Sequence, residues 1–334
     1  MTDMFRNAFS KPERFSFYLI AVFIILAGWL HLGPALLAGL FSYFALERLR
    51  FGGRVGKWLA LALFIVLLAA LVYALGYLVN ATVRALPEIA ERSTSAFIDW
   101  AREHQITLPF TDYDSLKTFV GETAKDQAHY LANIARFARG AASQFALVFI
   151  ACVIAVGIFF QPALELEPEK HAIAGNLYSA CCQTVAQRFM TFYRSFATVM
   201  GAQLVISGIN TVLTGVFAFV MHLPYAPVII GTTFFCGLLP IIGNLLSNTI
   251  IVGIGITVSP KVAMACLIFL IGVHKLEYFL NSKIVGDRIR NPFWLTLFAL
   301  ILGEKLMGVP GMVLAPVVLN YIKLEASAVK GPGP

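Results

Sequence analysis

The chain has 334 residues, of which 59% are hydrophobic and only 13% are charged. Soluble globular domains carry about 25% charged residues, so this composition excludes an ordinary soluble globule and indicates lipid as the solvent. The formal net charge of +7 does not indicate nucleic acid as a partner, because no basic patch interleaved with aromatic residues suggests base recognition. Lys and Arg are instead expected on the cytoplasmic side of a membrane, facing anionic headgroups. We therefore predict an all-α, polytopic integral membrane protein.

Eight apolar segments divide the chain, and a straight helical span needs about 20 apolar residues. The segments lie at 15–32, 34–46, 57–80, 143–160, 197–221, 227–258, 261–280 and 293–322. The first has no small-residue cleavage site, so it is expected to be an uncleaved helix, and it forms a bent hairpin with the second at Gly33-Pro34. Basic residues before the first segment and again at 48–57 predict a cytoplasmic N-terminus.

Residues 81–140 form a water-soluble helical insert that alternation places outside the membrane. Its apolar stripes must pack on something, either the membrane helices of the same chain or a neighbouring subunit. Asp112 or Asp114 is a plausible N-cap for its second helix. Residues 163–196 then combine charges with aromatic residues, which predicts an interfacial amphipathic helix on the cytoplasmic side.

Two apolar segments are broken near their middle. Segment 227–258 contains Pro and Gly within 237–244, and segment 293–322 contains three glycines and a proline within 303–311. Each predicts a re-entrant helical hairpin, whose tip must lie inside protein or face a water-filled cavity. The alternative is a pair of ordinary kinked hairpins that span the membrane fully.

A helix followed by a broken hairpin occurs twice, first at 197–258 and then at 261–322, with opposite predicted orientation. An inverted repeat of this kind is typical of secondary transporters, in which the breaks mark the binding site. The expected domains are an N-terminal membrane scaffold at 1–80, the insert at 81–140, a membrane helix with a cytoplasmic segment at 141–196, a transport unit at 197–325 and a disordered tail at 326–334. Both termini are expected in the cytoplasm.

The candidate pathway residues lie at the two tips. They are Pro240, Gly243, Asn244, Asn248, Gly303, Glu304, Lys305, Gly308 and Gly311. Ionisable groups at membrane depth are functional candidates, although Glu304 and Lys305 could equally form a solvated surface pair. Membrane asparagines, Asn210 included, bind solute or join helices by hydrogen bonds.

Three polar residues near the cytoplasmic end of segment 261–280, His274, Lys275 and Glu277, are expected to have a surface role, with ion coupling as the alternative. Phosphate-binding loops, nucleophile motifs and metal-ligand motifs do not occur in the sequence. We therefore expect no catalytic residues, no metal and no cofactor.

Local motifs resemble the AI-2E family of bacterial transporters, named for autoinducer-2 export. The residues that carry the resemblance are Leu239-Pro240-Ile241-Ile242-Gly243, Lys283-Ile284-Val285-Gly286, Asn291-Pro292, the three glycines of the second tip and Ala315-Pro316. The chain departs from many members by placing Glu304-Lys305 between the paired glycines. The resemblance implies a homo-oligomer in the bacterial inner membrane that exports a small polar solute similar to autoinducer-2, with Na⁺ or H⁺ as coupling ion.

The leading hypothesis is therefore a secondary transporter in the lipid bilayer that works by alternating access. A channel or pore is one alternative. A membrane scaffold that transports nothing and recruits a partner through the insert at 81–140 is another.

Overall fold

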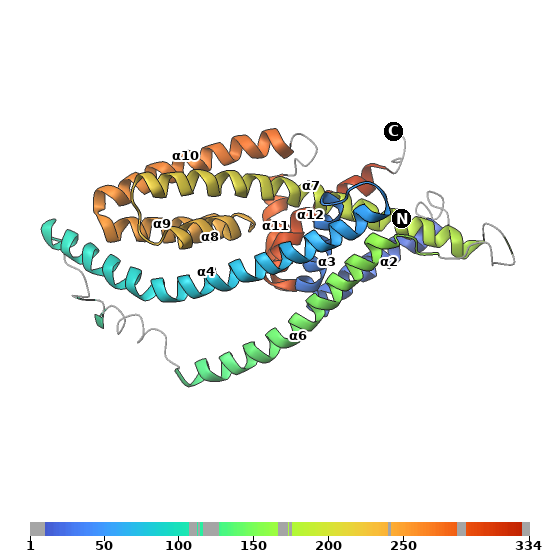
Figure 1. The fold of residues 1–334 in the computed structure, drawn as a ribbon, viewed down its shortest axis with the longest axis horizontal. Helices are drawn as coiled ribbons and strands as arrows, with labels where there is room; N and C mark the ends of the chain where they lie inside the picture. The colour runs from blue at the N-terminus through green and yellow to red at the C-terminus, as the bar shows by residue number, and fades with distance from the viewer. Residues whose placement is uncertain are drawn as a thin grey trace. The chain divides into compact units, whose positions relative to one another are not determined.

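The computed structural model describes residues 11–106, 112, 114–115, 127–165, 173, 176–239, 242–285 and 292–328. Every regular element in those ranges is an α-helix (Figure 1). The helices are α2 (Lys11–Trp29), α3 (Gly33–Arg48), α4 (Gly53–Glu103), α6 (Gln127–Phe160), α7 (Leu177–Val220), α8 (Ala226–Gly237), α9 (Ile242–Val258), α10 (Pro260–Val285), α11 (Phe293–Met307) and α12 (Val309–Ser327). By length and composition, five described helical stretches could cross a membrane: Pro12–Trp29, Val55–Glu103, Leu177–Val220, Pro260–Leu280 and Val309–Ser327. The predicted all-α membrane class is confirmed.

The first two helices meet at the predicted bend. His31 has a φ of 54°, and the Leu32 N–H donates to Ala27 O at 2.9 Å, so α2 ends in a left-handed C-terminal cap. Proline then occupies the first turn of α3, where its missing N–H costs nothing.

Two helices are longer than the apolar segments that they contain. Helix α4 continues from the apolar segment 57–80 into the predicted helical insert and ends at Glu103, with Pro87 inside it. Similarly, α7 runs without a break through the expected amphipathic segment and the following membrane helix. A change from apolar to polar residues alters what a helix faces but does not end it, and a proline removes one hydrogen bond and bends the helix.

The chain forms two compact units. Unit 1 comprises Met1–Leu67, Ala141–Gly201 and Arg288–Pro334, and unit 2 comprises Leu68–Gly140 and Ala202–Asp287. Helices α11 and α12 pack on each other and contact α2 and α3 within unit 1. In unit 2, α9 packs on both α8 and α10. The core of unit 2 contains Ala85, Ile89, Ala218, Leu223, Val228, Ile229, Ile251, Ile254, Cys266 and Leu270.

The first part of the insert packs on its own chain. Ala85 and Ile89 belong to the core of unit 2, and Ser93 Oγ donates to Gly253 O at 2.9 Å. This part of the insert therefore packs on the membrane helices of its own chain, which is the first of the two alternatives predicted for the insert. The second apolar stripe, at 116–137, lies outside the side chains that the structure describes.

Asp112 is one of the two predicted N-cap candidates in the insert. The Ser115 N–H donates to Asp112 Oδ1 at 2.7 Å, which is the geometry of a helix N-cap. This hydrogen bond lowers the pKa of the Asp112 carboxyl, because it stabilises the ionised form.

Both predicted breaks are present, and each separates two packed helices. The first lies between α8 and α9, and the second lies at Gly308, whose φ is 66°. A side chain at Gly243 would overlap Cys236 O. Similarly, a Cβ on Gly303 or on Gly311 would overlap the carbonyl oxygen of the other. The glycines therefore allow the two helices of each hairpin to approach closely.

Candidate functional site

The C-terminal end of α8 is fully hydrogen-bonded without water. A helix leaves its last four carbonyl oxygens without partners inside the helix. Two of those in α8 accept backbone N–H groups, from Leu238 to Phe235 O at 3.2 Å and from Leu239 to Cys236 O at 2.8 Å. The other two are satisfied from α7.

The donors from α7 are side chains. Ser207 Oγ donates to Phe234 O at 2.6 Å, and Gln203 Nε2 donates to Gly237 O at 2.5 Å. Because every terminal carbonyl has a partner, the end of α8 can lie inside protein at membrane depth.

A carboxylate lies beside this break. Glu277 of α10 accepts hydrogen bonds from Asn244 Nδ2 of α9 at 3.1 and 3.0 Å. It also accepts one from Asn210 Nδ2 of α7 at 3.3 Å. Hydrogen bonds to an ionised group are about twice as strong as those between neutral groups. Three helices of unit 2 are therefore joined at one charged side chain.

Glu277 is partly buried and hydrogen-bonded, whereas His274 and Lys275 of the same segment are exposed. Helix α10 continues beyond the predicted segment to Val285. Glu277 therefore lies within the helix, on the face toward α7 and α9.

A small cavity adjoins Glu277. Its volume is about 20 Å³, which is room for about one water molecule. Asn210 is 6% exposed, and its Oδ1 is buried without a hydrogen-bond partner in the part of the chain that the structure describes. The lining residues are Asn210, Thr214, Thr233, Gly237, Asn244, Ser247, Asn248, Ile251, Leu270, Val273, His274 and Glu277.

The chemistry of this lining restricts what it can bind. One carboxylate, several amides and several hydroxyls offer oxygen atoms, which suit a proton or a hard cation. Among the described residues, no group of three or more His, Cys, Asp or Glu could hold a metal ion.

The predicted candidates at the first tip have different roles. Asn244 and Asn248 line the cavity, and Gly243 lies where α9 meets the end of α8. Pro240 lies outside the described residues.

The candidates at the second tip belong to unit 1. Glu304 and Lys305 lie in the last turn of α11 and form an exposed ion pair with an N–O distance of 3.5 Å. Gly303 and Gly311 form the close contact between α11 and α12, and Gly308 separates the two helices.

The sequence contained a signal for Gln203, Ser207 and Thr214 of α7, which the sequence analysis did not single out beside Asn210. Gln203, Ser207, Asn210 and Thr214 recur every three or four residues in an otherwise apolar helix. This spacing places them on one face. A polar stripe along a membrane helix is expected to face protein or water instead of lipid.

The comparison with known families agrees with this architecture. The model of the AI-2E family transporter matches residues 15–328, nearly the whole chain. The chain belongs to the AI-2E transporter family. Membership confirms the resemblance carried by the glycine and proline motifs, and it makes the protein a multi-pass membrane protein of a transporter family.

A named bacterial protein is similar to this chain over a shorter stretch. The "Putative transport protein YdbI" of Bacillus subtilis (strain 168) is 27% identical over 133 residues, which are 39% of this chain. The match covers 38% of the length of that relative. Its name agrees with a transport function and specifies no solute.

Proposed function

We propose that the protein is a cation-coupled secondary transporter that exports a small polar solute, autoinducer-2 or a similar molecule, across the bacterial inner membrane. The observation that carries the proposal is the Glu277 carboxylate, held by Asn210 and Asn244 beside a broken membrane helix. Broken helices in membrane transporters provide polar groups at membrane depth without exposing them to lipid.

Helix lengths support re-entrant hairpins. At about 1.5 Å per residue, the 12 residues of α8 extend about 18 Å and the 15 residues of α11 about 22 Å. The hydrocarbon core is about 30 Å thick. Neither of these first arms is long enough to cross it, which would place each tip within the membrane. The second arm of the second hairpin, α12, has the length to cross a membrane, so the argument from length rests on α8 and α11.

The size of the cavity supports a cation in preference to the solute. A space of about 20 Å³ admits a proton, a Na⁺ ion or one water molecule and excludes an organic solute. The unpartnered Asn210 Oδ1 would accept a hydrogen bond or coordinate a cation beside the carboxylate. In this proposal, loading Glu277 changes the charge at the tip of the first hairpin and so biases its position.

The solute pathway would open when the hairpins move. Its candidates are the tip residues already described: Pro240, Gly243, Asn244, Asn248, Gly303, Glu304, Lys305, Gly308 and Gly311. The N-terminal helices would form the fixed scaffold of a homo-oligomer, with both termini in the cytoplasm. The start of the insert would move with the first hairpin, because Ala85 and Ile89 belong to the core that contains α8 and α9. Alternating access then needs the predicted transport segment at 197–325 to move.

The test uses proteoliposomes that contain the purified full chain and the pH-sensitive dye pyranine. With an imposed Na⁺ gradient, the wild type should change the internal pH, and Glu277→Gln should abolish that change because the amide cannot release a proton. Glu88→Gln is the matched control, since Glu88 belongs to the same unit and is 47% exposed. Unchanged ion flux in Glu277→Gln would refute the coupling role.

Uptake of labelled autoinducer-2 into inside-out vesicles tests the solute and the tips. Glu304→Gln and Pro240→Ala should both reduce saturable uptake. If uptake is unchanged in both, the tips are not part of the pathway. Ionic conductance that does not saturate would instead indicate a channel.

A further inference from the structure

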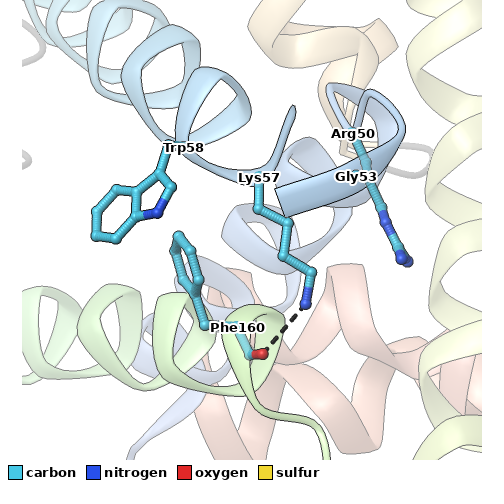
Figure 2. Close-up of a pocket in the computed structure, with 5 residues that line it drawn as sticks. All are labelled: Arg50, Gly53, Lys57, Trp58 and Phe160. Carbon is cyan, nitrogen blue, oxygen red and sulfur yellow. Dashed lines mark hydrogen bonds between the residues drawn. The ribbon is translucent and has the colours of Figure 1, made fainter. Parts of the chain in front are cut away.

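We propose that a basic pocket at the start of α4 binds the phosphate of an anionic phospholipid headgroup. The pocket is in unit 1, has a volume of about 550 Å³ and is lined by Arg50, Gly53, Lys57, Trp58 and Phe160. Figure 2 shows the cationic side chains of Arg50 and Lys57 at this pocket, with the rings of Trp58 and Phe160 beside them. Small-molecule pockets in proteins typically have volumes of 300–1,000 Å³, so an entire headgroup fits.

The charge of the pocket suits a phosphate. The Arg50 side chain is 54% exposed, and its N–O distance to Glu47 is 3.8 Å, at the limit of an ion pair, so the guanidinium remains available. Gly53 opens α4 with a φ of 80°. The N–H groups of the first turn of a helix lack intrahelical acceptors and favour anions.

Lys57 is held in place by a second helix. Its Nζ donates to Phe159 O at 3.3 Å and to Phe160 O at 3.1 Å, at the C-terminal end of α6. Figure 2 shows the second of these bonds. An ammonium group has three N–H donors, so these two bonds leave one for a ligand. The amine is therefore preorganised, and its binding to an anion costs less side-chain entropy.

The pocket lies where two apolar helices end. The apolar stretch Gln144–Phe160 of α6 finishes here, and the membrane candidate Val55–Glu103 of α4 begins here. Leu46, Ala60, Phe64 and Phe159 form the core that joins these ends. In a bilayer, the polar ends of such apolar helices would lie at the level of the lipid headgroups.

The aromatic side of the pocket, formed by Trp58 and Phe160, favours a lipid over free phosphate. Trp58 is 62% exposed, and its ring lies 4.9 Å from that of Phe160. Exposed tryptophans are typical of the membrane interface. Beyond Trp58, the exposed Leu59 and Leu63 of α4 offer a surface for acyl chains. An inorganic phosphate would use the charges and leave these apolar surfaces without a role.

The experiment measures lipid retained by the purified full chain, by native mass spectrometry after mixing with phosphatidylglycerol or phosphatidylcholine. Arg50→Gln should reduce the retained phosphatidylglycerol about fivefold, the effect of one basic residue at an anionic surface. Arg102→Gln is the matched control, because Arg102 is also exposed and also faces a carboxylate three residues earlier, at 3.7 Å. It should retain as much as the wild type.

A second variant and a competitor complete the test. Trp58→Leu keeps the charges and should also lower phosphatidylglycerol retention, which a free-phosphate site would not do. Equal retention by Arg50→Gln and the wild type would overturn the proposal. Displacement of the lipid by millimolar inorganic phosphate would show a phosphate site instead of a lipid site. The outcome is independent of whether Glu277 carries a cation, since the pocket belongs to the other unit.

Discussion

Gly243 and Gly253 lie on the same helix, α9, but in different surroundings. A side chain at Gly243 would overlap the backbone oxygen of Cys236, whereas one at Gly253 would meet nothing within 4 Å. Only the first glycine is therefore required by a close approach, and it is the one in the proline-glycine motif.

Gly243→Ala is expected to lower the stability of the protein by about 1–3 kcal/mol, because backbone would have to move to relieve the overlap. Gly253→Ala should be neutral or slightly stabilising, since alanine favours a helix interior. The measurement is the midpoint of thermal unfolding in detergent, followed by circular dichroism. Equal midpoints for the two variants would contradict the close approach of α9 to the end of α8.

At the residue scale, the features that depend on local chemistry, such as helix breaks, could be predicted from the sequence. Glycine and proline interrupt a helix wherever they occur in this pattern, so the break near Gly243 was predictable. The role of Glu277 was not, because it depends on which faces of α7, α9 and α10 meet. A single carboxylate near a helix end is compatible with a solvent-exposed role until its partners, Asn210 and Asn244, are placed beside it.

At the scale of elements, a buried ion pair joins three helices of unit 1. Arg188 of α7 pairs with Glu325 of α12, and these side chains are only 11% and 13% exposed. Arg188 Nε also donates to Ser16 Oγ of α2 at 2.7 Å, and its guanidinium lies 3.6 Å from the centre of the Phe17 ring. Arg188 is therefore buried between helices, although its segment was expected to lie at the membrane interface.

Arg188→Met should lower the free energy of unfolding by about 3–5 kcal/mol, since it leaves the Glu325 carboxylate buried without its partner. The double variant Arg188→Met/Glu325→Leu should recover much of the loss, because no unpaired charge remains. Both are measured as unfolding midpoints in detergent.

The matched control for this ion pair is Arg92→Met. Arg92 forms an ion pair with Glu88 at 2.7 Å, but these side chains are 61% and 47% exposed. Exposed pairs contribute about 0–1 kcal/mol, so a small change is expected. If Arg188→Met is as mild as this control, the buried pair does not hold α2, α7 and α12 together.

Element boundaries were predicted unevenly for a physical reason. The breaks within 227–258 and 293–322 carry their own terminators, Gly and Pro, and they were placed correctly. Hydropathy marked only residues 57–80 of α4 as an apolar segment, because it reports the surroundings of a helix and not its hydrogen bonds. The segment after Asn80 stays helical and packs through Ala85 and Ile89 on the core of unit 2.

At the scale of the whole molecule, the inverted repeat remains a prediction about sidedness. Each repeat consists of a long helix and a helical hairpin, α7 with α8–α9 and α10 with α11–α12. The basic residues Lys283, Arg288 and Arg290 between the apolar segments 261–280 and 293–322 predict that the second hairpin is entered from the cytoplasm. Contacts within the chain do not determine the side from which each hairpin enters, because only a membrane defines sidedness.

Cysteine labelling tests the repeat directly in a background that lacks the five native cysteines. His222→Cys and Lys261→Cys flank the first hairpin, and Trp294→Cys and Ser327→Cys flank the second; all four positions are exposed. With a membrane-impermeant maleimide, the first pair should react only from outside the cell and the second pair only from the cytoplasmic side.

Asp112→Cys serves as the reference for the outer side, since Asp112 is exposed in the predicted external insert. It should react together with the pair that flanks α8–α9. If the two hairpins enter from opposite sides, the result supports alternating access by residues 197–325. Each tip would then approach the membrane centre from its own side. If all four positions react from one side, the repeat is not inverted, and the transport mechanism proposed for the two tips is wrong.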